Sequence, residues 1–286
     1  MSHTLRMENL ENKTKQGEVF TKESVGNGVN ISTREAEEYR AFKKQKKIAE
    51  ITGAICRSAT GISFKEDMKK LVEHAVRFHQ AAVQVRLPQL AQVQSYLLKS
   101  RVKIDCIIGG NGETLAKVKA YEAKLARKMG AKELTLVLTP SYIATGRYGE
   151  LKKEIKRVQR AAKGTTLKVW VENKYSFPML ARMARLVSEM DVKYFCVPYF
   201  EGCQRLRYDL LKGCRLEVSE VENLEGFKEM VGAGVERVVT SHIQELYLEW
   251  MREVDTMPLL SDQKPMSGLV LPGEKPLSPT TELKIV

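Results

Sequence analysis

Eight short runs of apolar, often β-branched residues alternate along this chain with stretches of helical periodicity. The runs begin between 21 and 34 residues apart. This alternation predicts parallel strands joined by right-handed helical crossovers. Eight near-equal units are typical of a (β/α)8 TIM barrel. An open doubly wound sheet is the alternative, but no Gly-rich first turn supports it. The predicted strands are residues 51–56, 81–86, 103–109, 133–138, 167–172, 194–199, 215–220 and 237–242.

Both ends of the chain differ in composition from this repeating part. Residues 1–31 are polar and lack periodicity, which predicts an extended or disordered arm. A capping box that ends at Glu35 predicts an extra helix over 33–50. Residues 254–286 are rich in proline, so we expect an extended tail that follows a partner, with a plain disordered tail as the alternative. The barrel domain, with its extra N-terminal helix, is therefore predicted over 32–253.

Composition limits the partners and the compartment. The net charge of +12 suits an acidic partner: a nucleic acid, an anionic protein surface or a phosphorylated ligand. No run of 18 apolar residues is present, so no membrane span is predicted. The first 20 residues lack the apolar core of a secretory signal and contain three acids. We expect a cytoplasmic protein, with cytoskeletal association and an unusual mitochondrial import signal left open.

The cysteines do not predict a metal site. Five are present, an odd number, and none forms a CxxC pair, which is typical of reduced thiols. Cys196, Cys203 and Cys214 lie seven and eleven residues apart, whereas zinc sites usually begin with two ligands two to four residues apart. We therefore expect no metal and no cofactor.

Three of the stretches between the predicted strands have helical character. Residues 112–131 have helical spacing and a glycine stop, and residues 177–190 carry Pro178 where a first turn tolerates it. The apolar positions of the first stretch are Leu115, Val118, Tyr121, Leu125 and Met129. The third stretch, residues 149–164, is basic.

Cations in this third stretch recur at steps of three and four, which places most of them on one face. They are Lys152, Lys153, Lys156, Arg157, Arg160 and Lys163. With the KKQKK segment at 43–47 they form the most concentrated basic surface of the chain. A solvated outer helix is one interpretation, and a docking face for an acidic protein or for RNA is the other. No aromatic residue interleaves these cations, which favours a protein partner over RNA.

Three segments together resemble the deoxyribose-phosphate aldolase family. They are VKIDCIIGGNGETLAKVKAYEAKLARKMGAKELTLVL (102–138), LKVWVE (167–172) and FPMLARMARLVSEMDVKYF (177–195). The resemblance covers roughly residues 50–245 and rests on the order and spacing of features rather than on one motif. It implies a TIM barrel in which a lysine amine forms a Schiff base with an aldehyde substrate, while a carboxylate shuttles protons.

The resemblance also implies where the catalytic groups should lie, and this sequence departs from the pattern there. The nucleophilic lysine of the sixth strand is matched by Cys196, and a thiol cannot form an iminium. The proton-handling aspartate of the fourth strand is matched by Thr135. The second lysine, on the seventh strand, is matched by Glu217, which reverses the charge.

The phosphate-binding loops implied by the resemblance differ as well. The glycine pair after the seventh strand is matched within residues 219–222, where Glu220 and Glu222 would repel a phosphate dianion. After the eighth strand, only Ser241 is retained in kind. Each catalytic and phosphate-binding element is therefore missing or altered, while the segments of the scaffold are kept.

These departures lead to a hypothesis with two alternatives. We interpret the chain as a non-catalytic aldolase-like barrel, a structural or scaffolding subunit of a larger assembly such as a cytoskeletal or ribonucleoprotein complex, of unknown oligomeric state. One alternative is an active aldolase or lyase on deoxyribose 5-phosphate, or a related phosphorylated sugar, that uses Lys174 after the fifth strand; Lys168 is expected at the other end of that strand. The other is an RNA-associated protein. Cys196 could act as a nucleophile with His242, but a buried thiol is favoured.

Overall fold

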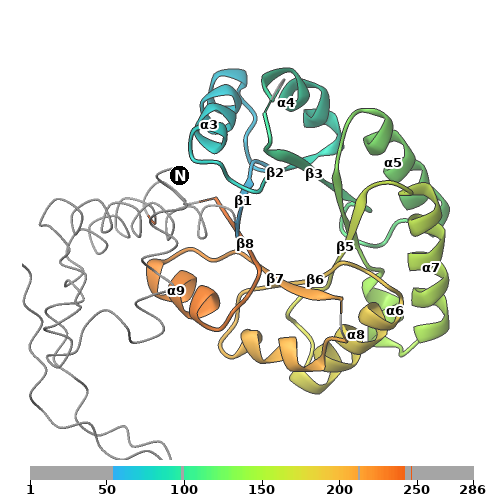
Figure 1. Cartoon of the computed structure of the whole chain (residues 1–286). Coiled ribbons are helices and arrows are strands. Elements are labelled where there is room, and N and C mark those ends of the chain that lie inside the picture. The colour runs from blue at the N-terminus through green and yellow to red at the C-terminus, as the bar shows by residue number, and fades with distance from the viewer. Residues whose placement is uncertain (1–53, 98–99, 212, 242–245, 247–286) are drawn as a thin grey trace, which may run out of the picture. The chain divides into compact units, whose positions relative to one another are not determined.

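The eight strands close into a parallel barrel in which each strand pairs with the next and β8 pairs with β1 (Figure 1). The computed structural model describes residues 54–97, 100–211, 213–241 and 246. The strands are β1 Ile55–Ser58, β2 Ala82–Arg86, β3 Lys103–Ile108, β4 Glu133–Val137, β5 Thr166–Trp170, β6 Tyr194–Pro198, β7 Arg215–Ser219 and β8 Arg237–Thr240. The predicted TIM barrel is confirmed.

Helices surround this barrel as an outer ring (Figure 1). The helices are α3 Lys65–Arg77, α4 Leu90–Tyr96, α5 Ala116–Lys128, α6 Pro140–Ala144, α7 Tyr148–Ala161, α8 Phe177–Glu189 and α9 Leu224–Gly232. Two 3-10 helices complete the described crossovers, η2 Leu87–Gln89 and η3 Cys203–Asp209. Pro178 lies in the first turn of α8, as predicted, where its missing N–H is not needed.

The first strand differs from the prediction. The sequence placed it over 51–56, whereas β1 is Ile55–Ser58, and residues 51–53 lie outside the described part. Its position follows from pairing, because Cys56 lies beside both Ala82 of β2 and Val239 of β8. Only the run that faces both neighbours can complete the ladder that closes the barrel.

Strand residues alternate between two environments. One set is apolar, packs between the sheet and the helices, and is at most 3% exposed: Val83, Ile104, Leu134, Val169, Phe195, Leu216 and Val238. Burying each such side chain contributes about 1.5–3 kcal/mol to folding. The alternate positions point into the barrel and include buried polar and charged residues such as Asp105, Glu133 and Lys168.

Helix α5 does not bury the apolar positions that its sequence pattern suggests as a core face. Leu115, Val118 and Tyr121 are 64%, 38% and 66% exposed. Its buried residues are Lys119, Ala123 and Ala126. Two of these are small enough to let the helix approach the sheet closely.

The third, Lys119, is held in place by polar contacts. Its ammonium donates to Glu154 of α7 at 2.5 Å and to the carbonyl oxygens of Gly112 and Val137 at 2.6 and 2.9 Å. A hydrogen-bonded ion pair, rather than an apolar ridge, therefore fixes the rotation of α5 about its axis.

The predicted terminal segments lie outside the described residues. The arm at 1–31, the helix over 33–50 and the tail at 254–286 stay predictions. Within the described part of the chain, no helix combines the length and the apolar character that a bilayer crossing requires.

Candidate functional site

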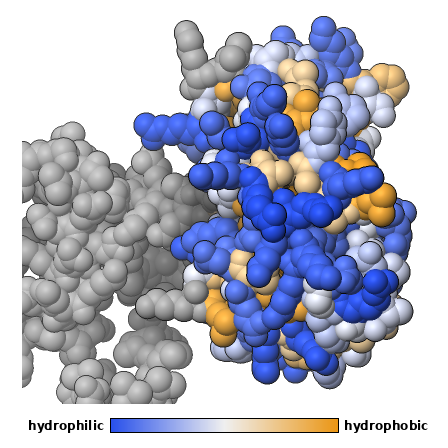
Figure 2. All heavy atoms as spheres, turned by 90° about the vertical axis from the view of Figure 1, so that its right-hand side faces the viewer, coloured by the Kyte–Doolittle hydropathy of each residue, from blue (hydrophilic) through white to orange (hydrophobic). Residues whose placement is uncertain are grey.

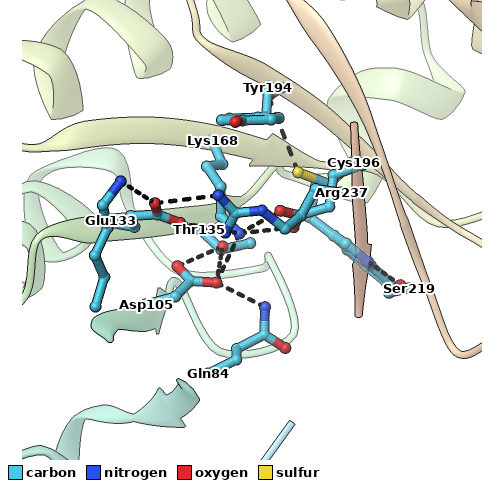
Figure 3. A network of polar contacts seen from close by, with 12 residues as sticks. Gln84, Asp105, Glu133, Thr135, Lys168, Tyr194, Cys196, Ser219 and Arg237 are labelled. Atoms are coloured by element: carbon cyan, nitrogen blue, oxygen red, sulfur yellow. Dashed lines mark hydrogen bonds and ion pairs between the residues drawn. The ribbon is translucent and has the colours of Figure 1, made fainter. Parts of the chain in front are cut away.

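A buried lysine lies at the centre of the barrel interior (Figure 3). Lys168 is the third residue of β5, and its side chain is fully buried. Its ammonium lies 2.6 and 2.7 Å from the two carboxylate oxygens of Glu217 on β7, and 2.8 Å from Asp105 on β3. A third carboxylate, that of Glu133 on β4, lies at 3.9 Å. Strands β3 and β7, on opposite sides of β5, thus each supply a carboxylate to the ammonium of Lys168.

The opposite side of the same network is basic. Arg237 of β8 donates to Glu133 at 3.1 Å, and its guanidinium lies 5.4 Å from the ring centre of Tyr194. Lys103, at the start of β3, also binds Glu133 at 3.1 Å. Together with the more distant Lys168, three cations therefore share Glu133, which offsets the cost of burying its charge.

Neutral donors occupy the remaining positions around Asp105. Thr135 of β4 donates to its carboxylate at 2.8 Å, and Gln84 of β2 donates at 2.9 Å. The carboxylate of Asp105 therefore has partners from three strands and no exposure to solvent. Such full satisfaction stabilises one arrangement of a buried polar network.

The electrostatics of this arrangement favour a protonated Lys168. Burial by itself would lower the pKa of its ammonium, but Asp105 and Glu217 outweigh burial and raise the pKa well above the ordinary value. Burial also raises the pKa of Glu217, and Lys168 offsets part of that rise. Lys168 is therefore a structural cation in this state, and its amine lacks the free electron pair that a nucleophile needs.

Cys196 of β6 lies in the same interior, beside Glu217 in the β6–β7 register. Its thiol is fully buried and lies 4.0 Å from the carbonyl oxygen of Tyr194. Burial raises the pKa of this thiol well above its ordinary value, and Glu217 raises it further. These surroundings suppress the thiolate, which is the reactive form.

One layer of side chains separates the ion pair from the mouth at the carboxyl ends of the strands, where TIM-barrel chemistry takes place. Trp170 and Ser219 end β5 and β7, two residues after Lys168 and Glu217 on the same sides of their strands. The indole N–H of Trp170 donates to Ser219 at 3.4 Å. This contact spans the interior above the ion pair.

Lys174 lies beyond this layer, in the loop after β5. Its side chain is 55% exposed and pairs with Glu172. The hydrogen bond that Lys174 donates to Glu172 raises the pKa of Lys174. A Schiff-base lysine requires a lowered pKa, so the direction is opposite to that role.

The loop after β7 keeps a backbone shape suited to glycine. Glu220 has a φ of 60°, in the left-handed region that side chains other than glycine rarely adopt. Glu220 and Glu222 are both exposed, and Ser241 is exposed after β8. The loop therefore presents two carboxylates at a turn where the family resemblance implies glycines.

A cavity of about 330 Å³ lies at the other end of the barrel, where β5 and β6 begin. Its lining includes Gln159, Lys163, Asp191 and Lys193. The catalytic face of a TIM barrel is the opposite one. Among the residues that the structure describes, no group of three His, Cys, Asp or Glu side chains is placed to hold a metal ion.

The predicted cations of α7 lie on its outer side. Lys152 and Lys153 pair with Glu189 and Glu150 at 3.0 and 2.9 Å. Lys156, Arg157, Arg160 and Lys163 are exposed, and none of them forms an ion pair with another described residue. The shared face that the spacing predicted is thus present.

The structure brings together most of the positions that the sequence singled out. Thr135, Cys196 and Glu217 all lie around the ammonium of Lys168. Lys168, expected towards the N-terminal end of its strand and away from the catalytic face, is the third residue of β5, and its buried side chain lies one layer below the mouth. Lys174 and Ser241 lie at the mouth, apart from the network, and His242 lies outside the described residues.

Sequence reasoning missed Asp105, Glu133 and Arg237. Asp105 interrupts an apolar strand run with a charge, and Glu133 and Arg237 each begin one, and this signal could have identified them. The pattern alone does not show whether such a charge points inward or towards the helices.

The closed barrel with a charged interior defines a TIM-barrel protein, and the comparisons then give its family. An aldolase from Staphylococcus epidermidis is 32% identical over 191 residues, covering 63% of this chain and 86% of that protein. One from Actinobacillus succinogenes is 34% identical over 109 residues, which are 38% of this chain and 49% of that relative. Both are deoxyribose-phosphate aldolases by name. The chain belongs to the deoxyribose-phosphate aldolase family.

Solved structures agree on the fold. The crystal structure of a protein from Coccidioides immitis, described as a deoxyribose-phosphate aldolase, superposes with a TM-score of 0.68 at 23% identity. The match covers 76% of this chain and 97% of that one. No protein-family model matches the chain.

Proposed function

We propose that this protein is an aldolase-family barrel that does not carry out the aldol reaction and serves as a structural, scaffolding subunit of a larger assembly. The observation that carries the proposal is the position of Lys168, buried and ion-paired between Asp105 and Glu217. An amine in that state neither reaches a substrate aldehyde nor attacks it.

The chemistry of a Schiff base makes this argument specific. A neutral amine adds to the aldehyde and water leaves, giving an iminium that accepts electrons from the breaking carbon–carbon bond. Lys168 is held as an ammonium by its acidic neighbours and is fully buried, one layer below Trp170 and Ser219. Lys174 is accessible, but Glu172 stabilises its charged form.

The mouth of the barrel supports the same proposal. A phosphorylated sugar needs backbone N–H groups and cations at the loops after β7 and β8. Glu220 and Glu222 are exposed at the first of these loops. Their charges oppose a phosphate dianion, so the mouth does not suit the substrate class of the family.

The positively charged surface supports a role in binding. The exposed cations of α7 present a surface for an acidic protein, and no exposed aromatic on that helix side offers a stacking platform for RNA bases. An assembly built on protein contacts is therefore favoured, with an RNA-bound state as the outcome to be tested against it.

Borohydride trapping tests the loss of chemistry. The protein is incubated with deoxyribose 5-phosphate and sodium borohydride, which reduces any iminium to a stable secondary amine, and its intact mass is measured. We expect no adduct, while the Staphylococcus epidermidis aldolase, treated in parallel, gains one. An adduct on this protein would overturn the proposal. If an adduct formed, its absence in the Lys174→Met or the Lys168→Met variant would identify the reacting amine.

RNA binding is tested by measuring affinity for a mixed-sequence RNA as salt is raised. Contacts to several phosphates give a steep fall of log affinity with log salt. We expect weak binding with a shallow slope. A steep slope that Arg157→Ala and Arg160→Ala both reduce would favour the RNA-associated alternative.

A further inference from the structure

Three large apolar side chains at the start of helix α5 are exposed to solvent. Val118 and Tyr121 lie three residues apart on one side of the helix, and Leu115 is its N-cap residue; the three are called here the α5 stripe. They make up half of the six most exposed large hydrophobic residues in the described part of the chain. Single exposed apolar residues are ordinary, whereas a group of them marks a contact surface.

The three residues of the stripe are not among the buried residues of α5. The helix is anchored through Lys119, Ala123 and Ala126 on another side, and through the ion pair between Lys119 and Glu154. The stability of the fold therefore gives no reason for Tyr121 to be aromatic. This separation also means that the stripe can be altered without disturbing the core.

A row of cations borders the stripe. Lys117, Lys124 and Lys128 are exposed on the same helix, and none forms an ion pair with another described residue. Arg127 donates to the carbonyl oxygen of Lys163 at 3.3 Å, which connects the basic end of α5 to the basic face of α7. Figure 2 faces the side of the barrel that α5 and α7 form, and shows a largely hydrophilic surface broken by hydrophobic patches.

We propose that the α5 stripe and its lysine border form a docking surface for an acidic amphipathic helix of a partner protein. Apolar side chains of the partner would cover Val118 and Tyr121, and its carboxylates would meet Lys117 and Lys124. Such a contact places an aromatic anchor at the centre and charges at the rim, as many helix-binding surfaces do. The inference rests on the proposed scaffolding function and names the chemistry of the partner.

Charge distinguishes the proposed acidic helix from other molecules that could cover the α5 stripe. A second copy of this chain would bring one lysine row against another, and like charges across an interface disfavour association. A nucleic acid would satisfy the lysines but leave the apolar stripe against a charged backbone. An acidic helix with one apolar side satisfies both parts of the surface.

The experiment uses the full-length protein and a fluorescent 18-residue synthetic helix with leucines on one side and glutamates elsewhere. The scrambled sequence of the same composition is the control peptide. Fluorescence anisotropy should show that the amphipathic peptide binds at least about tenfold more tightly than the scrambled one. Tyr121→Ala should weaken binding about tenfold or more, as loss of an aromatic anchor does. Tyr208→Ala, which removes a tyrosine of η3 that is even more exposed (82% against 66% for Tyr121), should leave binding unchanged.

Charge reversal is tested in the same assay. Lys124→Glu should weaken binding and flatten its dependence on salt, while Lys70→Glu, on the exposed side of α3, should not. Equal binding of the two peptides, or equal effects of Tyr121→Ala and Tyr208→Ala, would overturn the proposal. A dimer in sedimentation that Tyr121→Ala dissociates would also overturn it and assign the surface to a second copy. These readouts are independent of borohydride trapping, so either proposal can fail alone.

Discussion

Lys168 of β5 and Glu217 of β7 meet inside the barrel at 2.6 Å, and neither side chain is more than 1% exposed. Burying a pair of this kind costs desolvation free energy, and the attraction between the two opposite charges offsets that cost. Removing Lys168 leaves the carboxylates of Glu217 and Asp105 buried without this cation. This asymmetry makes the pair a sensitive point in the fold.

Substituting Lys168 by methionine should destabilise the protein by about 3–5 kcal/mol, because Asp105 and Glu217 would then be buried without their cation. Urea unfolding followed by circular dichroism measures this change. The matched control is the double variant Lys168→Met with Glu217→Met, which removes both charges and should recover part of the loss. A single variant as stable as the parent protein would contradict the buried network.

The amine of Lys168 should resist chemical modification in the folded state. Its pKa is raised above the ordinary lysine value, so its contribution to stability is present in full below that value and is lost only as the pH rises through the folded pKa. Acetic anhydride at about pH 9, where exposed lysines react, should modify Lys70 and leave Lys168 intact. Peptide mass mapping checks this, with the unfolded protein as the control in which both lysines react.

The thiols should react in the order of their exposure. Burial raises the pKa of Cys106 to about 12 and that of the half-buried Cys214 to about 11, and it raises the pKa of the fully buried Cys196 as well. Iodoacetamide at about pH 8 should therefore label Cys214 first and Cys196 far more slowly. Peptide mapping over time gives the order. Rapid labelling of Cys196 would instead support its role as a nucleophile.

Two glycines with the same backbone geometry should differ in their tolerance of a side chain. Gly112 has a φ of 93°, and a Cβ there would overlap the carbonyl oxygen of Leu138 and lie 2.7 Å from Cδ of Pro140. Gly164 has a φ of 90° with no atom within 4 Å of such a Cβ. Gly164→Ala should cost about 1–2 kcal/mol from the left-handed conformation alone. Gly112→Ala should cost at least about 2 kcal/mol more, as measured by urea unfolding, because the loop after β3 must also move. Similar costs for the two variants would contradict the close packing around Gly112.

Local patterns were enough to predict the barrel. The spacing of the apolar runs placed seven strands within a residue or two of their observed positions, because parallel strands between helices must be apolar and short. β1 was placed too early, since its limits depend on pairing with both β2 and β8. Helix α5 was predicted from its periodicity, yet its rotation depends on a lysine that pairs with α7.

The candidate site divides in the same way. Family resemblance drew attention to Thr135, Cys196 and Glu217, and these do gather around one point. It did not show that Lys168 occupies that point, because the inward direction of a strand side chain is set by register across the whole barrel. The acids that hold Lys168 come from strands about fifty to sixty residues away along the chain.

The sequence by itself determined the number and order of strands and the family, and it shows a cysteine rather than a lysine at position 196. These follow from periodicity and residue identity, which are local. Only the tertiary structure decided that Lys168 is a buried, charged centre and that the α5 stripe faces solvent. Both depend on which residues meet across the closed barrel, where burial and pairing set the free energy of each charge.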